Sequence, residues 1–311
     1  MQLLNYISSK TNYKMKTLLF IFLSAYLNSA QEVKFSYDLG KVVFEANIFE
    51  ITPEVKGNVN SITFTPDGKE VYFSYINESR KVKIYFSKYI NGKWSEAKLV
   101  DFSSDKNDNN PFITYDGSKM YFASQRGLEY NPSKNDYDIW FVERIDTTWG
   151  KPTRINLAAI NSSANEGTPV LDKNGNLYFS SSREGGYGKN DIYLAKFNGE
   201  EYTEIINLGS EINSSFDDFY PMVDSESNFI LFSSYRGEGN GLAEIYFAEL
   251  VDFKPQNLKA LNSFVNTEGY EYAPYLDPSN KYIFFTRISS KQRKIMYINK
   301  EVVGVNFNIE R

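Results

Sequence analysis

A pair of apolar residues, aromatic in most copies, recurs along this chain at nearly constant spacing. This repeat constrains the fold more than any other feature of the sequence. The second members of the pairs occupy positions 73, 122, 179, 232 and 285, so successive copies lie 49, 57, 53 and 53 residues apart. The five pairs are Tyr72-Phe73, Tyr121-Phe122, Tyr178-Phe179, Leu231-Phe232 and Phe284-Phe285. A period near 50 residues is typical of arrays whose units bury their faces against one another.

Each repeat unit has the pattern of four short antiparallel strands. A turn precedes the pair, and in three units it contains Asp-Gly or Asn-Gly, the strongest short hairpin signal. These turns are Asp67-Gly68, Asp116-Gly117 and Asn174-Gly175. A further strand begins about ten to twenty residues after each pair, at Ile84, Ile139, Ile192, Ile245 and Ile295, and a less regular strand follows it. Four strands in about fifty residues predict an all-β fold, a β-propeller of four-stranded antiparallel blades.

The number of units predicts five blades. They extend from about residue 58 to the end of the chain, and residues 31–57 contain extra strand-forming sequence, notably Lys41–Ile51. A propeller ring must close, so we expect this segment to supply the outer strand of the blade that contains Phe285. A six-bladed ring is the alternative, which would need a whole blade from this segment and the C-terminal tail.

The N-terminal residues have the pattern of a secretory signal. Lys14 and Lys16 precede the apolar stretch Leu18–Leu27, and the small residues Ser29 and Ala30 end it. This order predicts a signal peptide at residues 1–30, because about ten apolar residues are too few to span a bilayer. The remainder, residues 31–311, is predicted to be a single propeller domain. We expect it in the periplasm or outside the cell, with no membrane insertion after the signal is removed.

The composition excludes several kinds of site. The chain contains no cysteine and no histidine, so disulfides, thiol nucleophiles, Ser-His-Asp triads and His-ligated metals are excluded. We therefore expect no cofactor and no metal. Residues 1–30 contain three lysines and no acid, so their removal leaves 31 basic residues (34 less three) against 39 acidic ones, a net charge of −8. An acidic chain without a basic block argues against a nucleic-acid partner.

Acids and arginines occupy repeated positions around the predicted inner strands. An acid stands three residues before a proline in four units: Asp108, Glu166, Asp218 and Glu271. An arginine follows the second strand of the same units: Arg126, Arg183, Arg236 and Arg287. Both positions fall at the same end of an up-and-down blade, so these groups are predicted to share one face near the channel mouth. Either they form ion pairs that staple the blades, or they line a polar pocket for a sugar or peptide.

Tyrosines fall in the loops of the same face. They are Tyr130, Tyr137, Tyr187, Tyr220, Tyr270 and Tyr272. Their rings could stack on sugar rings or partner side chains, or pack between blades. Tyr187 and Tyr220 are the binding candidates, because each lies in a loop or strand end beside a repeated acid.

The segment Pro169–Tyr193, which reads PVLDKNGNLYFSSSREGGYGKNDIY, resembles the WD-type repeat of TolB-like β-propellers. Pro111–Phe141 and Pro221–Phe247 match this pattern less completely, and the first and last units lack its glycines. The resemblance extends over about 250 residues and implies a scaffold in the cell envelope that interacts with proteins or glycans. The separate N-terminal domain of TolB is absent from this sequence.

These observations predict a secreted or periplasmic propeller that binds an envelope protein or glycan through its loop face, with no catalytic residues. The alternative is a carbohydrate-active enzyme, a glycoside hydrolase or lyase. Such an enzyme would use two channel-mouth carboxylates at about 5–10 Å separation. An asymmetric acid cluster in a deep channel mouth would indicate the enzyme. An evenly spaced ring of acids neutralised by arginine would indicate the binding scaffold.

Overall fold

The computed structural model of the chain describes residues 44–52, 55, 58–128, 131, 135–237 and 242–307. All of them belong to one compact unit, Leu39–Arg311. The predicted signal peptide and Tyr130 lie outside the described residues.

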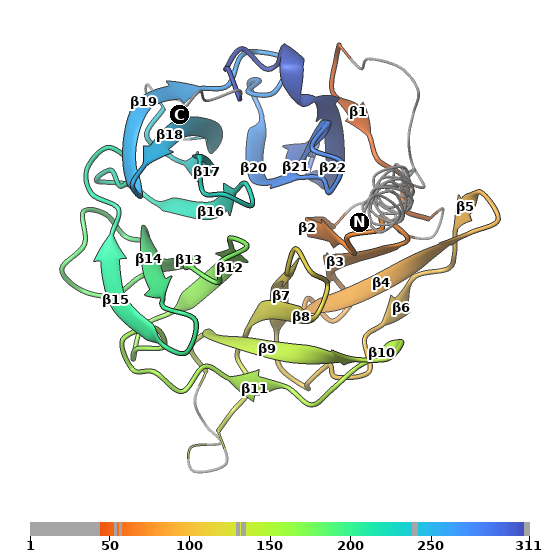
Figure 1. Cartoon of the computed structure of the whole chain (residues 1–311). Helices are drawn as coiled ribbons and strands as arrows, with labels where there is room; N and C mark the ends of the chain where they lie inside the picture. The colour runs from red at the N-terminus through yellow and green to blue at the C-terminus, as the bar shows by residue number, and fades with distance from the viewer. Residues whose placement is uncertain are drawn as a thin grey trace, which may run out of the picture. The chain divides into compact units, whose positions relative to one another are not determined.

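The described residues form five antiparallel sheets arranged as the blades of a propeller (Figure 1). Blade I consists of β2 (Val59–Phe64), β3 (Glu70–Ile76), β4 (Val82–Ile90) and an outer strand divided into β5 (Lys93–Trp94) and β6 (Lys98–Leu99). Blade II consists of β7 (Asp108–Ile113), β8 (Lys119–Ser124), β9 (Asp138–Ile145) and an outer strand divided into β10 (Thr148–Trp149) and β11 (Thr153–Arg154).

The remaining three blades have undivided outer strands. Blade III consists of β12 (Glu166–Leu171), β13 (Leu177–Ser181), β14 (Asp191–Phe197) and β15 (Tyr202–Asn207). Blade IV consists of β16 (Asp218–Val223), β17 (Phe229–Ser234), β18 (Glu244–Val251) and β19 (Lys254–Ala260). Blade V consists of β20 (Tyr270–Leu276), β21 (Tyr282–Ser289), β22 (Gln292–Asn299) and β1 (Asn47–Ile48), and a short 3₁₀ helix, Lys300–Val302, follows β22.

The ring closes through its N-terminal strand, as the sequence predicts. Strand β1 pairs antiparallel with β22, with Asn47 opposite Tyr297 and Ile48 opposite Met296. This strand lies in the blade that contains Phe285, so the five-bladed prediction is confirmed and the six-bladed alternative is wrong. Closure by a segment distant in sequence ties the two ends of the repeat array together.

The repeated pairs form the core. Their second members, Phe73, Phe122, Phe179, Phe232 and Phe285, are all completely buried. Because successive strand residues point to opposite faces, each pair presents one side chain to the preceding blade and one to the following blade. The spacing of the repeat thus places one buried apolar layer, aromatic in most blades, on each side of every blade.

A β-bulge interrupts the inner strand of blades II to V at the residue before each proline. These residues adopt positive φ although none is glycine: Asn110 (54°), Thr168 (52°), Tyr220 (53°) and Ala273 (54°). A bulge leaves one residue unpaired and bends the strand, so its backbone turns toward the propeller axis. The axial cavity measures only about 40 Å³ and is lined from all five blades. The channel is therefore packed, with no room for a ligand along its axis.

Candidate functional site

The four predicted acid–arginine pairs all form, each within one blade. We call the end of the propeller that holds them the loop face; the opposite end, where tight turns join the first and second strands, is the turn face. The nitrogen–oxygen distances are 2.8 Å for Arg126–Asp108, 3.4 Å for Arg183–Glu166, 2.8 Å for Arg236–Asp218 and 2.7 Å for Arg287–Glu271. The four acidic side chains are 0% exposed and the arginine side chains between 13% and 18%. The carboxylates are thus covered and neutralised.

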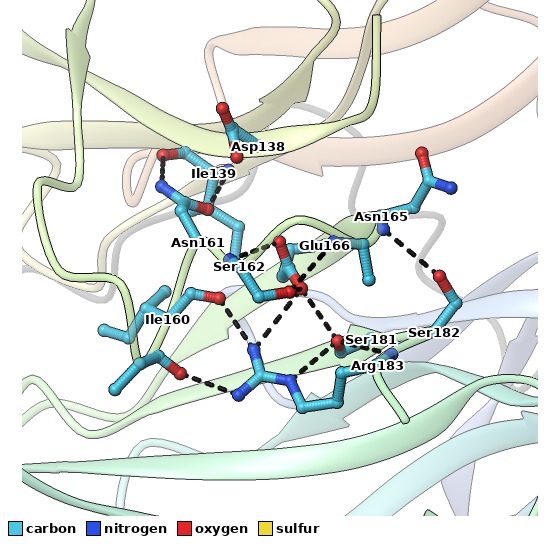
Figure 2. Close-up of polar contacts among 12 residues, drawn as sticks. Asp138, Ile139, Ile160, Asn161, Ser162, Asn165, Glu166, Ser181, Ser182 and Arg183 are labelled. Atoms are coloured by element: carbon cyan, nitrogen blue, oxygen red, sulfur yellow. Dashed lines mark hydrogen bonds and ion pairs between the residues drawn. The ribbon is translucent and has the colours of Figure 1, made fainter. Parts of the chain in front are cut away.

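Figure 2 shows the hydrogen bonds that hold the Glu166–Arg183 pair of blade III in place. Glu166 accepts hydrogen bonds from the backbone N–H of Ser162 (2.9 Å) and from the hydroxyls of Ser162 (2.5 Å) and Ser181 (2.8 Å). Arg183 donates to the Ser181 hydroxyl (2.9 Å) and to the carbonyl of Ile160 (2.8 Å). Ser162 and Ile160 belong to the loop that arrives from blade II. The pair therefore fastens the crossover between two blades to the second strand.

Burial raises the pKa of Glu166 above its usual value, and the bonds from Ser162 and Ser181 and the charge of Arg183 offset this only in part. This ion pair is the longest of the four, and the guanidinium also donates to the backbone carbonyls of Ala159 (2.7 Å) and Ile160.

Blades V and I depart from this pattern. In blade V, Arg287 stands directly opposite Glu271 in the strand register and donates through Nε to the carboxylate. In blades II to IV a serine takes this register position, as Ser181 does opposite Glu166. Blade I has Val59 opposite Tyr75 and no acid at the position. Four of the five blades thus carry a charged pair, and the equivalent position of blade I is apolar.

Tyr220 and Tyr272 close the channel mouth at this position of blade I. Asn60 donates its amide to the Tyr220 hydroxyl (2.9 Å) and accepts from the Tyr272 hydroxyl (2.8 Å), and Arg293 Nε donates to Tyr272 (3.2 Å). Burial raises the pKa of Tyr220 well above its usual value. Its ring packs 5.5 Å from that of Tyr272. Tyr220 therefore acts as a packing residue in the structure, which removes it from the candidates for an exposed anchor.

The other candidate tyrosines differ in exposure. Tyr187 is 53% exposed. Tyr270 is partly buried in the cluster that includes Tyr235 and Ile288. Tyr137 is also partly buried, and burial raises its pKa.

The loop that presents Tyr187 is held rigidly. The carboxylate of Asp191 accepts from the backbone N–H groups of Tyr187 (2.7 Å) and Gly188 (2.9 Å). A Cβ at Gly186 would lie 2.3 Å from Asp191 Oδ2, and one at Gly188 would lie 1.8 Å from the carbonyl oxygen of Phe216. Only glycine fits these two positions. The loop is therefore packed against its neighbours, and Tyr187 projects from it into solvent.

Phe216 extends the exposed aromatic surface beside Tyr187. It is also 53% exposed, and its carbonyl accepts from the backbone N–H of Lys189 (3.1 Å). The sequence analysis missed Phe216, because the residue lies in a crossover loop outside the repeated motif.

A mouth pocket of about 180 Å³ lies on the same face as this aromatic pair. Four asparagines line it, Asn109, Asn110, Asn165 and Asn190, together with Glu166, Thr168, Ser180 and the rings of Tyr137, Phe219 and Tyr220. The Oδ1 atom of Asn110 is buried and has no hydrogen-bond partner among the described residues. A buried acceptor without a partner costs free energy, so this atom is suited to receive a donor from a ligand. Only one of the four acid-x-x-Pro segments contains asparagine, Asn109-Asn110 before Pro111, so the repeat itself did not indicate this pocket.

No group of three or more acidic residues that could hold a metal ion occurs in the described parts of the chain. Those parts also contain no helix long and apolar enough to cross a membrane.

No family profile and no curated protein sequence matches the chain. Among solved structures, a TolB structure from Agrobacterium tumefaciens is 16% identical, with a TM-score of 0.54 over 84% of this chain and 87% of that one. A thermostable family-43 glycoside hydrolase is 12% identical, with a TM-score of 0.55 over 84% of this chain and 98% of that one. TolB from Acinetobacter baumannii is 15% identical with a TM-score of 0.49; the match covers 79% of this chain but only 55% of that one.

Sequence identity at this level shows the fold alone. A TolB protein and a glycoside hydrolase resemble the chain equally well, so likeness of fold does not choose between binding and catalysis. The sheet topology and the matched structures agree on the fold. This chain is a β-propeller with five four-stranded blades, a fold similar to that of the TolB structure and of the family-43 glycoside hydrolase.

Proposed function

We propose that this protein is an exported, non-enzymatic binding module that takes an envelope protein or glycan on its loop face. The observation that supports this most is the presentation of Tyr187, an exposed ring on a loop that Asp191 and two glycines hold in place. A large exposed aromatic side chain on a rigid loop loses little conformational entropy on binding. Phe216 beside it and the mouth pocket on the same face would complete the surface.

The four repeated acids support the binding role over catalysis. A glycosidase needs one carboxylate that exchanges a proton with substrate and another that reaches the anomeric carbon or a water molecule. Asp108, Glu166, Asp218 and Glu271 are buried and bound to arginines. They are neutralised by arginine in four of the five blades, as expected of a scaffold, and hydrolysis would require other carboxylates.

The test is to apply the full chain to arrays of oligosaccharides and peptides and to repeat the binding with Tyr187→Ala. We expect this variant to bind its best array ligand more weakly by about 1–3 kcal/mol, the range of an interface hot spot. Phe264→Ala is the matched control, because Phe264 is also exposed (46%) but lies in the crossover between blades IV and V and not in the Tyr187 loop of blade III. It should bind as the wild type does.

Both variants should keep the wild-type melting temperature, since neither ring is buried. Unchanged binding by Tyr187→Ala would place the functional surface elsewhere. Release of reducing ends from arabinan or xylan oligosaccharides by the wild-type protein would favour the carbohydrate-active enzyme instead.

A further inference from the structure

A second recess lies away from the loop face, in a groove between blades II and III that opens beside the turns joining the first and second strands. We call it the inter-blade groove and define it by Lys119, Phe141, Asn156, Asn174, Phe197 and Tyr202. Its volume is about 780 Å³, against about 180 Å³ for the mouth pocket. The volume lies within the range of about 300–1,000 Å³ that is typical of small-molecule sites.

Both walls of the groove are aromatic. Blade II contributes Phe141, whose ring lies 5.5 Å from that of the buried Tyr121, and blade III contributes Phe197 and Tyr202, with ring centres 5.2 Å apart. Phe141, Phe197 and Tyr202 are all only partly buried. The Tyr202 hydroxyl hydrogen-bonds that of Tyr121 and bridges the two walls. The exposed ring faces are flat apolar platforms fixed by their packing.

The cations around the groove are already neutralised. Lys119 lies 3.2 Å from Glu143 and also sits over the ring of Phe141, at 5.0 Å from its centre. Arg154 is paired with Asp138 at 2.7 Å. Lys173 is similarly paired with Glu226 at 2.5 Å.

The remaining polar groups of the lining are amides, acids and hydroxyls, among them Asn156, Asn174 and the exposed Glu200. The amide and carboxylate oxygens accept hydrogen bonds from hydroxyls, and the carboxylates repel anions. The lining therefore favours an uncharged ligand that has apolar ring faces and many hydroxyls.

We propose that the inter-blade groove binds a neutral oligosaccharide. The C–H faces of its sugar rings would lie on Phe141, Phe197 and Tyr202, and its hydroxyls would bond Asn156, Asn174 and Glu200. This site is separate from the loop-face surface proposed above, and each proposal stands or fails independently of the other.

The test is a calorimetric titration of the full chain with three neutral probes, cellopentaose, xylopentaose and arabinopentaose, and with one acidic probe, trigalacturonate. We expect at least one neutral probe to bind and trigalacturonate to bind more weakly. Phe197→Ala should weaken binding by at least about tenfold, since it removes one platform. Tyr187→Ala, on the loop face, should change the affinity less than about twofold.

A second variant keeps the test valid if Phe197→Ala folds poorly. Lys119→Glu combined with Phe197→Arg places in this groove the kind of ion pair that closes the neighbouring interface between blades I and II. It should abolish binding of the neutral probe while the thermal midpoint is retained.

Absence of binding by all three neutral probes would overturn the proposal, as would preferential binding of trigalacturonate. A loss caused by Tyr187→Ala but not by the groove variants would also overturn it, and would support the loop face as the glycan site. Binding of an array peptide that requires Phe197, without binding of any neutral probe, would overturn it in favour of a peptide groove.

Discussion

The interfaces between blades I and II and between blades II and III are built from the same positions but differ in chemistry. Glu70 of blade I and Lys119 of blade II each stand two residues before the tyrosine of the repeated pair. They face the next blade, where the paired residues of the third and outer strands are Arg144 and Trp149 in blade II, and Phe197 and Tyr202 in blade III.

In the first interface these positions are joined by charge. Glu70 accepts from Arg144 (2.9 Å) and Lys88 (2.8 Å), and Tyr72 donates to Glu70 (2.9 Å) and accepts from the indole of Trp149 (2.9 Å). The Arg144 guanidinium also lies over the Trp149 ring at 4.8 Å. The network is mostly buried, and it binds two blades together.

At the equivalent positions of the second interface, the contact is between the hydroxyls of Tyr121 and Tyr202. Lys119 stands in place of an acid and Phe197 in place of an arginine, so these two positions form no ion pair with each other, and the space beside them is the inter-blade groove. A hollow of about 490 Å³ also lies beside the first interface, but Glu70, Lys88 and Arg144 line it with charge. The comparison teaches that a repeat can change the lining of an inter-blade hollow from charged to aromatic by substituting two equivalent positions.

The largest expected effect comes from breaking the charged network. Glu70→Ala should lower the free energy of unfolding by about 3–5 kcal/mol, because it leaves Arg144 mostly buried without its carboxylate. Lys119→Ala, the equivalent change in blade II, should cost less than about 1 kcal/mol, because the Lys119–Glu143 pair is exposed. Urea unfolding measures both, and equal losses would show that the two interfaces are equally cohesive.

A smaller difference in unfolding free energy between the two interfaces is expected when one aromatic residue of each is truncated. Trp149→Ala should cost roughly 2–3 kcal/mol, somewhat below a core tryptophan because its ring is only partly buried. Phe197→Ala should cost about 1 kcal/mol, because one side of its ring already faces the groove. The same unfolding experiment applies, and a loss at Phe197 that matched the loss at Trp149 would mean that the groove is closed in solution.

The hydroxyl bridge offers a finer test. Tyr202→Phe removes the hydroxyl that interacts with Tyr121 and should cost about 1 kcal/mol, the usual net value of one hydrogen bond. The ring of residue 202 stays in place in this variant. Glycan binding in the groove should therefore persist, and its disappearance would show that the hydroxyl contacts the ligand.

The smallest effect should appear in the pH dependence of stability. Burial by itself raises the pKa of Glu70, but hydrogen bonds from Arg144, Lys88 and Tyr72 outweigh it and hold the pKa below its usual value. The folded state therefore binds this proton less readily than the unfolded state does. The stability that Glu70 contributes is full above the unfolded pKa and is lost as pH falls through the lowered folded value.

Glu70→Gln should accordingly lose less stability than the wild type when the pH is lowered from 7 to 3. Glu143→Gln is the control and should follow the wild-type curve, because the side chain of Glu143 is 63% exposed. Parallel curves for Glu70→Gln and the wild type would contradict the ionic character of the first interface.

Much of this fold could be predicted from the sequence. The spacing of the pairs located the buried strands, and the Asp-Gly and Asn-Gly turns located the hairpins, because strand alternation and positive φ are local properties of the chain. The partners of the repeated acids were also predictable. The two residues of each pair are separated by a short hairpin, as Asp108 and Arg126 are, so the strand register alone brings them together.

The bulges were not predictable in the same way. Positive φ at Thr168 or Tyr220 is unfavourable for the isolated residue, and the surrounding structure must supply the stabilisation. One source is visible at Ala273, whose backbone N–H donates to Ser233 of the preceding blade (3.1 Å). The packing role of Tyr220 has a similar origin, since its partner Asn60 is 160 residues away.

The sequence by itself thus predicted the repeated four-stranded blades, their buried apolar pairs and the shared face of the acids and arginines, because each depends on residues within one repeat. Only the tertiary structure decided which tyrosines are exposed, how the channel is closed and where a groove opens. Those features depend on side chains from different blades meeting across an interface: Glu70 and Arg144 are 74 residues apart and meet only when the ring is assembled. A repeat motif specifies the blade, whereas the contacts between blades arise from the residues in which the repeats differ.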